Sequence, residues 1–341
     1  MKKFLLKTVI FLLGGVILSH GLAAIADRLS PNHNTMALWN DQKHMREMLS
    51  RSSEIEALAI GNSHMGCLQF ERLGYRGHRF ARSAGDLFEI RYHLEQLIPR
   101  MKAVQTVFFS ISYGSFHEDN AASDEVNIRR ADVYTSLPSW QFIDGDFGNF
   151  VRGKTRLLIP FTSLLRKDNW QGVFYALLGK TGKTEQFVEI AQDDCSYMET
   201  EEWIDHAKTN RVAKLVRLQK QMLASRPDLV NNTYNTLVST IRFLRQRGIR
   251  TVFFTPPYPK MYTDCFRSCL PETLATMKSR MRRLQQTENI EYYDLSQDDE
   301  FVTERRLFKD SDHLNGCGAR IFSMRFKRLI AETEPTMSVH K

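Results

Sequence analysis

Three side chains that could form a nucleophilic centre lie in two segments that are far apart in the sequence. Ser63 follows a short apolar run in EIEALAIGNSHMGCLQF (54–70), and Asp310 and His313 lie together in FKDSDHLNGCGARIF (308–322). A serine hydroxyl is a poor nucleophile at neutral pH unless a base lies within hydrogen-bond reach and a third group orients that base. With a spacing of three residues, the Asp310 carboxylate can accept a hydrogen bond from His313 Nδ1 and leave Nε2 facing outward. The three residues together predict a catalytic triad.

The residues around Ser63 also have structural interpretations. Gly61 allows a bend, and Asn62 or Ser63 could cap the helix after an ordinary strand-to-helix turn. A phosphate-binding loop is excluded, because Cys67 and Leu68 occupy the positions where such a loop needs Lys followed by Ser or Thr. The choice between a cap and a nucleophile depends on the rest of the chain.

Neighbouring polar residues leave further alternatives open. Asp310, Asp312 and His313 could form a solvated turn or offer metal ligands, but a single cluster without a second one on another strand is weak evidence for a metal. We therefore expect no metal and no cofactor. His64 adjoins Ser63, and an adjacent residue cannot easily turn onto Oγ, so we interpret His64 as structural or substrate-facing.

Short apolar runs alternate with helical patterns, as in proteins whose parallel sheet is covered by helices on both faces. The predicted strands are 55–60, 78–81, 104–111, 250–255 and 290–295. The predicted helices are 35–52, 229–247, the segment from Pro271 onward, and 318–330. We expect one α/β domain, a three-layer α/β/α sandwich with a central parallel sheet. Ligands bind beyond the carboxyl ends of such strands, so 61–64, 112–117, 256–258 and the segment after Leu295 are expected along one edge.

Residues 118–206 interrupt the alternation and are too long for a plain loop. They carry Trp140, Trp170, Trp203 and the acidic stretch EIAQDDCSYMETEEW. We expect an insertion over the active-site edge that serves as a lid or substrate-binding segment, with ordinary structural packing as the alternative.

The N-terminus has the pattern of an export segment. Lysines precede an uncharged, mostly apolar stretch over 8–26, which is long enough to span a bilayer when the preceding Phe-Leu-Leu is included. Basic residues on the leading side place the N-terminus in the cytoplasm and the following chain outside. Ala-Ile-Ala at 24–26 also resembles a signal-peptide cleavage site. We favour an uncleaved transmembrane anchor over 1–26, and either interpretation exports residues 27–341.

Charge and cysteine content narrow the class of protein further. The net charge is +8, but basic residues are scattered among acidic ones, so a nucleic-acid partner is not expected. Five cysteines are an odd number, and at least one therefore lacks an intrachain partner. Cys265 and Cys269 are close enough in sequence for a local disulfide in an oxidising compartment. Cys67 and Cys317 lie in apolar helical patterns and are expected to be buried packing residues.

The two motifs, in this order and with α/β alternation between them, resemble the SGNH/GDSL hydrolase superfamily. Gly61-Asn62-Ser63-His64 stands where that family usually has Gly-Asp-Ser, and Asp310-x-x-His313 stands near the C-terminal end. The likeness covers about residues 54–330, apart from the insertion. With the N-terminal anchor, these blocks look most like envelope members such as the D-alanyl-lipoteichoic-acid biosynthesis and alginate acetylation proteins, which move or remove acyl groups on extracytoplasmic polymers.

The resemblance implies a role for each matching residue. Ser63 would be the nucleophile, His313 the base and Asp310 its orienter, while the backbone N–H groups of Ser63 and Gly85 would bind the oxyanion. The family's third oxyanion donor is an Asn after the 104–111 strand. The chain has no Asn there, so either Ser112 substitutes for it or the oxyanion hole has only two donors.

What the resemblance implies about function is an extracytoplasmic serine esterase or O-acyltransferase. It would act, with acetyl as the expected acyl group, on a cell-envelope or exported polysaccharide. It would sit in the inner membrane, facing the periplasm, with a membrane-bound O-acyltransferase or polysaccharide export machinery as candidate partners. The missing Asn leaves a second hypothesis, a non-catalytic glycan-binding or assembly component.

Overall fold

The structure is a computed structural model with two compact units, one of residues 46–126 and 189–341 and the other of residues 1–45 and 127–188. It describes residues 45–81, 85–123, 127–136, 139–143, 145–158, 194–197 and 211–333, with scattered positions among the first 18. No helix within this described part is both long and apolar enough to cross a membrane. Most of the predicted anchor over 1–26, and residues 35–44 of the first predicted helix, lie outside it.

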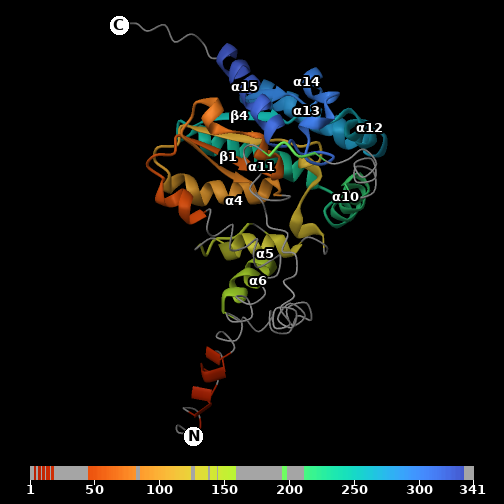
Figure 1. Ribbon diagram of the computed structural model, residues 1–341. Coiled ribbons are helices and arrows are strands. Elements are labelled where there is room, and N and C mark those ends of the chain that lie inside the picture. Colours follow the sequence, from red (N-terminus) through yellow and green to blue (C-terminus); the bar gives the residue numbers. More distant parts are fainter. Residues whose placement is uncertain are drawn as a thin grey trace, which may run out of the picture. The chain divides into compact units, whose positions relative to one another are not determined.

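A five-stranded parallel sheet forms the centre of the larger unit (Figure 1). Its strands are β1 (Ala57–Gly61), β2 (Gly77–Ala81), β3 (Thr106–Ser110), β4 (Arg250–Thr255) and β5 (Glu291–Asp294). The strand order is β2-β1-β3-β4-β5, with every neighbouring pair parallel. All five predicted strands are confirmed. Because the pairs are parallel, the segments that follow β1, β3, β4 and β5 lie along one edge, as expected.

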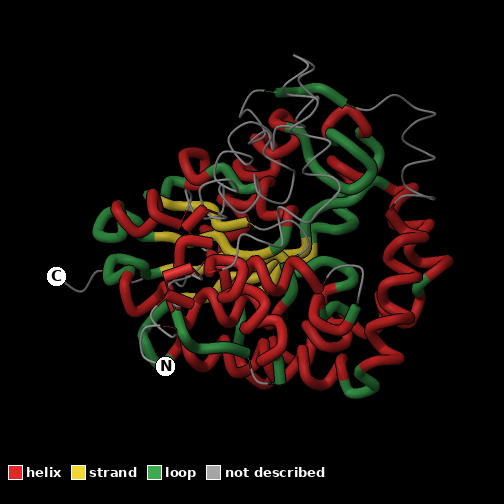
Figure 2. Tube along the Cα trace, turned by 90° about the horizontal axis from the view of Figure 1, so that it is seen from below, coloured by secondary structure: helices red, strands yellow, loops and turns green. Residues whose placement is uncertain are grey.

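Helices cover both faces of this sheet (Figures 1 and 2). They include α3 (Phe70–Leu73), α4 (Leu87–Leu97), α10 (Ala213–Ser225), α11 (Leu229–Arg245), α12 (Lys260–Cys269), α13 (Pro271–Glu288), α14 (Asp299–Val302) and α15 (Gly316–Thr333). Helix α11 is followed by Gly248 at φ 69°, and α13 begins with Pro271. These are the stop and start that the sequence predicts.

The alternation of strand side chains gives each face of the sheet its own core. One face contributes to a buried cluster with helix α15 that contains Ala57, Ala59, Phe108, Val252, Phe254, Phe322, Phe326 and Ile330. One residue further along, Phe109 and Phe253 stack with ring centroids 4.8 Å apart. Helices α4 and α11 pack against each other and against β1 and β4. Burial of both faces explains why the central strands read as continuous apolar runs.

The smaller unit contains two packed helices, α5 (Asn127–Ser136) and α6 (Phe147–Leu158). The carboxylate of Asp146 accepts hydrogen bonds from Arg130 at 3.1 Å and from the Tyr134 hydroxyl at 2.7 Å, and all three side chains are buried. Gly153 allows the close approach of the helices, since a Cβ there would lie 2.4 Å from the Ala131 carbonyl oxygen. This ion pair is therefore part of a packed polar interior.

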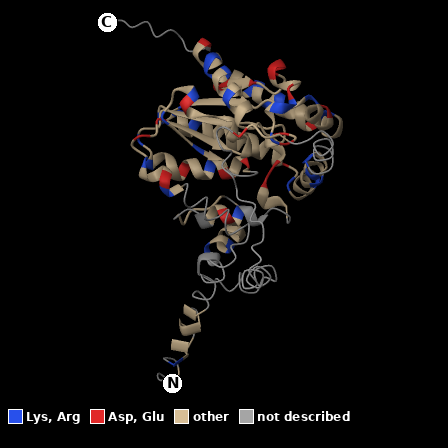
Figure 3. Cartoon of the chain, viewed as in Figure 1, with Lys and Arg blue, Asp and Glu red and all other residues tan. Residues whose placement is uncertain are grey.

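Charged residues of both signs are interspersed over the helices of the larger unit in the view of Figure 3. Several form pairs across elements: Glu288 at the end of α13 accepts from Arg242 and Arg245 of α11, and Arg250 pairs with Glu291 across β4 and β5. The Glu288 side chain is buried while both of its arginine partners are exposed, and the Arg250–Glu291 pair is half-buried.

The disulfide prediction is wrong. Cys317, at the start of α15, is bonded to Cys195, whereas Cys265 and Cys269 form no disulfide. Cys265 and Cys269 lie one turn apart on the continuous helix α12. Side chains at that spacing have Cβ atoms about 5–6 Å apart, beyond the roughly 3.5–4.5 Å that a disulfide needs. Cys67 is buried, as expected, but the same prediction is wrong for Cys317, which is half-buried and disulfide-bonded.

Removing the disulfide is expected to lower the free energy of unfolding. The bond closes a loop with a sequence separation of 122, so a Cys195→Ser/Cys317→Ser variant should lose about 2–4 kcal/mol, measured by urea unfolding. The exposed thiol variant Cys269→Ser is the matched control and should change stability by less than about 0.5 kcal/mol. Two of the five cysteines are bonded, so denatured, unreduced protein should show three titratable thiols. Five titratable thiols would contradict the cross-link.

Candidate active site

Asn62, and not Ser63, caps the short helical turn that follows β1. This turn, η1 (Ser63–Cys67), begins at Ser63. The Asn62 side-chain oxygen accepts hydrogen bonds from the His64 N–H and from the Ser110 hydroxyl, both at 3.1 Å. The backbone comes very close to Ser110, since a Cβ on Gly61 would lie 2.7 Å from its Oγ. Because Asn62 supplies the cap, the Ser63 hydroxyl is not needed for capping.

That hydroxyl meets His313. Ser63 Oγ lies 2.7 Å from His313 Nε2, across 250 residues of sequence. On the other side of the ring, His313 Nδ1 lies 3.0 Å from each carboxylate oxygen of Asp310. The structure therefore brings the three predicted triad residues together in the order hydroxyl, imidazole, carboxylate.

The turn before α15 fixes the orienting carboxylate. Asp310 Oδ1 also accepts hydrogen bonds from the backbone N–H groups of Asp312 at 3.0 Å and His313 at 2.9 Å. The base of the turn is closed by the hydrogen bond from the Lys309 N–H to the His313 carbonyl at 2.8 Å. Because the same short turn carries both residues, the spacing of three positions is enough to hold the carboxylate against Nδ1.

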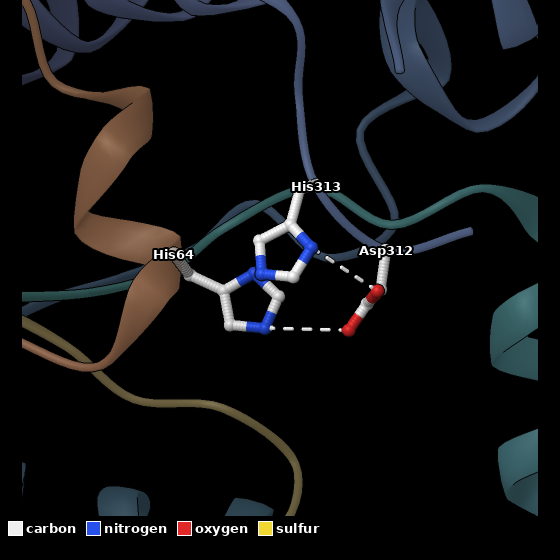
Figure 4. A group of neighbouring side chains, drawn as sticks. All are labelled: His64, Asp312 and His313. Atoms are coloured by element: carbon white, nitrogen blue, oxygen red, sulfur yellow. Dashed lines mark ion pairs between the residues drawn. The ribbon is translucent and has the colours of Figure 1, made fainter. Parts of the chain in front are cut away.

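Asp312 and His64 extend the network around His313 (Figure 4). The rings of His64 and His313 stack with centroids 4.5 Å apart. Asp312 lies beside both rings, 3.3 Å from His313 Nδ1 and 3.7 Å from His64 Nε2. His64 makes no contact that would let it serve as the base for Ser63, and it packs edge-on against Tyr258 instead. Its structural interpretation agrees with this geometry.

Arg211 also contacts this network, although no sequence motif points to it. Its Nε lies 3.1 Å from Asp312 Oδ1, and its terminal nitrogen lies 3.4 Å from Asp310 Oδ2 and 3.3 Å from His313 Nδ1. Arg211 comes just before α10, about a hundred residues from the turn that it contacts. It belongs to no local motif, so the sequence offers no signal for it.

Burial and charge shift the pKa of every ionisable group in this network. Burial lowers the pKa of His313, but the carboxylates of Asp312 and Asp310 outweigh it and raise that pKa to about 10. Burial raises the pKa of the Asp310 and Asp312 carboxyls, but the positive charges of His313 and Arg211 outweigh it. Both carboxyl pKa values therefore lie below their ordinary value. Burial, followed by the charge of His313, lowers the pKa of His64 to about 3. His64 is therefore neutral near pH 7, while His313 readily holds a second proton.

Gly85, a predicted oxyanion donor, and Asn62 line a small enclosed void that has no room for a water molecule. Its lining consists of Asn62, Gly85, Asp86, Leu87, Ile90, Ser110 and Ser115. Gly85 thus lines the same void as Asn62, the residue that precedes Ser63. Ser112 is not among the lining residues, and both its N–H and its hydroxyl pair with Ser115 Oγ, at 2.9 and 3.0 Å. The roles of Gly85 and Ser112 as oxyanion donors stay predictions.

His64, Asp312 and His313 lie close enough together to offer three ligand atoms to a metal ion. A cation is already present at this place, because Arg211 Nε lies against Asp312 Oδ1. A metal ion would have to displace that guanidinium. The residues fit an ion-pair network, and we derive no metal-dependent step from them.

The buried histidines predict a maximum of stability near pH 6.5. His64 and His117 have pKa values lowered by burial to about 3 and about 4. Below about pH 6.5 these histidines bind protons in the unfolded chain but not in the folded chain. The free energy of unfolding therefore decreases as the pH decreases. His313 has a raised pKa; its contribution is full below about pH 6.5 and is lost as the pH rises toward about 10. The two carboxyl groups with lowered pKa values, Asp310 and Asp312, change the stability only below about pH 4.

A single substitution checks the acid side of this profile. His117→Gln should reduce the slope of unfolding free energy against pH by about 1.4 kcal/mol per pH unit between roughly pH 4.5 and 6. Urea unfolding of both proteins across that range measures it. An unchanged slope would mean that His117 is protonated in the folded chain. Above about pH 6.5 the two curves should run parallel, which serves as the internal control.

Comparisons with known proteins add little to this geometry. No protein-family model and no curated protein matches the sequence. A crystal structure of a "putative acylhydrolase" from Bacteroides fragilis NCTC 9343 is similar at 9% sequence identity and a TM-score of 0.40, covering 84% of this chain and 94% of that one. At this TM-score the similarity carries no argument about fold or reaction.

Proposed function

We propose that the chain is a serine esterase or O-acyltransferase whose nucleophile is Ser63. The observation that carries this proposal is the 2.7 Å contact between Ser63 Oγ and His313 Nε2, with the Asp310 carboxylate 3.0 Å from Nδ1. A hydroxyl, a base and an orienting carboxylate in this order are what nucleophilic acyl transfer requires.

The reaction would proceed in two halves. Ser63 Oγ attacks the acyl carbonyl as its proton passes to His313 Nε2, and Asp310 stabilises the resulting imidazolium. His313 then returns the proton to the leaving alkoxide, which leaves an acyl group on Ser63. In the second half, water or a sugar hydroxyl gives its proton to His313 and attacks the acyl-enzyme, and Ser63 regains its proton. The backbone N–H groups of Ser63 and Gly85 are the proposed oxyanion donors, each contributing a few kcal/mol.

The substrate and location belong to the same proposal. The lysines and apolar stretch of residues 1–26 support export with an inner-membrane anchor, so the catalytic domain would face the periplasm. The resemblance of the two motifs supports an acyl group, acetyl first, on a cell-envelope or exported polysaccharide. A membrane-bound O-acyltransferase or export machinery would then be the partner.

Labelling with a serine-directed fluorophosphonate tests the proposal. The full-length chain in detergent micelles should be labelled, and peptide mass spectrometry should place the label on Ser63. Ser63→Ala should abolish labelling, whereas Ser239→Ala, at a half-buried position on α11, should not. A folded wild-type protein that takes no label and cleaves no acetate ester would favour the non-catalytic glycan-binding component.

A further inference from the structure

His313 Nδ1 faces more negative charge than a triad needs. Asp310 lies 3.0 Å away and Asp312 3.3 Å away, whereas the Nδ1 proton can bond to only one carboxylate well. One carboxylate is enough to orient the ring and stabilise the imidazolium during the reaction. A second one stabilises the imidazolium before the reaction, when His313 must be neutral to accept the Ser63 proton.

Arg211 is the cation placed to offset this surplus. It contacts both carboxylates, through Nε at 3.1 Å from Asp312 and through its terminal nitrogen at 3.4 Å from Asp310. The same terminal nitrogen lies 3.3 Å from His313 Nδ1. A positive charge at that distance opposes a second positive charge on the ring.

The other titratable groups around His313 do not replace it. From η1, His64 stacks on the ring and is kept neutral by burial. Tyr258 and Tyr262, from the loop after β4 and from α12, are buried with raised pKa values and stay neutral, and Glu118 acts on them as a further negative charge. Among the residues that the structure describes, the ionised groups in contact with His313 are therefore two carboxylates and one guanidinium, a net charge of one negative unit, as in a triad with a single carboxylate.

We infer that Arg211 is a positioning residue of the proposed triad, which offsets the charge of Asp312 and thereby lowers the pH above which His313 can act as a base. The inference rests on the proposed function, because only a catalytic His313 needs to be neutral. Arg211 precedes α10, so the segment that follows the predicted insertion supplies part of the electrostatics of the site.

The direct test is the titration of His313, followed by NMR of the imidazole in protein labelled at histidine Cε1. The Asp312→Asn background removes one carboxylate and brings the midpoint into an accessible pH range. In that background, Arg211→Gln should raise the His313 midpoint by about one pH unit or more. Arg211→Lys, which retains the charge, should keep the midpoint within about half a unit of the Asp312→Asn protein.

An unchanged midpoint in the Gln variant would overturn the inference, and so would a rise of a full unit in the Lys variant. The Lys comparison stands if the Gln variant does not fold. The pH profile of p-nitrophenyl acetate cleavage gives a second measurement in the same Asp312→Asn background, where Arg211→Gln should move the acid limb of kcat/KM to higher pH and keep the plateau within about tenfold of that background. A lower plateau with an unmoved limb would indicate a merely structural role and overturn the inference. The NMR titration needs no activity, so a failed esterase assay tests the proposed function and not Arg211.

Discussion

Ser63→Ala is expected to lower kcat/KM for p-nitrophenyl acetate by about 10⁴-fold or more. The hydroxyl that meets His313 Nε2 at 2.7 Å is the only part of the side chain that the substitution removes. Asn62 supplies the cap of η1, so the fold loses little by the change. His313→Ala should cost a similar factor. The Ser63→Ala/His313→Ala double variant should be no worse than either single variant, since residues that act as a unit are not additive.

The matched control is the same substitution, serine to alanine, at a position away from the site. Ser239 is half-buried on α11, where its hydroxyl donates to the Asn235 carbonyl at 2.8 Å. Ser239→Ala should retain wild-type kcat/KM. More than about a tenth of the activity surviving in Ser63→Ala would exclude an acyl-enzyme on this serine.

The framework of the site could be predicted because it depends on local patterns. Burial on both faces forces β1 and β3 to be continuous apolar runs, and the helices between them have a one-face periodicity. Parallel pairing then brings Ser63 and the segment after β5 to the same edge of the sheet. The Asp310–His313 pair could be predicted for a similar reason, since a single turn holds both residues.

What the sequence could not show depends on contacts between distant segments. Arg211 meets the 310–313 turn only through the fold, and a lone arginine carries no periodicity or motif. The Cys195–Cys317 disulfide could not be predicted for the same reason, since its cysteines are distant in sequence. Nearness in sequence favoured a bond between Cys265 and Cys269 instead. The sequence near His313 contains two carboxylates, Asp310 and Asp312. Their spacing does not show that Arg211, from another segment, contacts both of them.

Asp310→Asn and Asp312→Asn should separate the two carboxylates by their effects on rate. Asp310→Asn is expected to lower kcat/KM by about 10⁴-fold, because the amide can donate to Nδ1 and thereby hold the proton on Nε2, where Ser63 needs an acceptor. Asp312→Asn should cost less than about tenfold at its own pH optimum, and its acid limb should move to lower pH, since it removes a charge that holds the imidazolium. Full pH profiles of the two variants make the comparison.

The geometry gives the reason to expect this order and not its reverse. Asp310 is fixed by two backbone N–H groups and presents both oxygens to Nδ1 at 3.0 Å. Asp312 presents one oxygen at 3.3 Å, and the same oxygen lies 3.1 Å from Arg211 Nε, so its charge is already shared. If Asp312→Asn proved the more damaging of the two, Asp312 would be the orienter, and Arg211 would then act on the orienting carboxylate itself. A loss of the same size in both variants would instead mean that His313 needs the two carboxylates together, which the distances at Nδ1 do not favour.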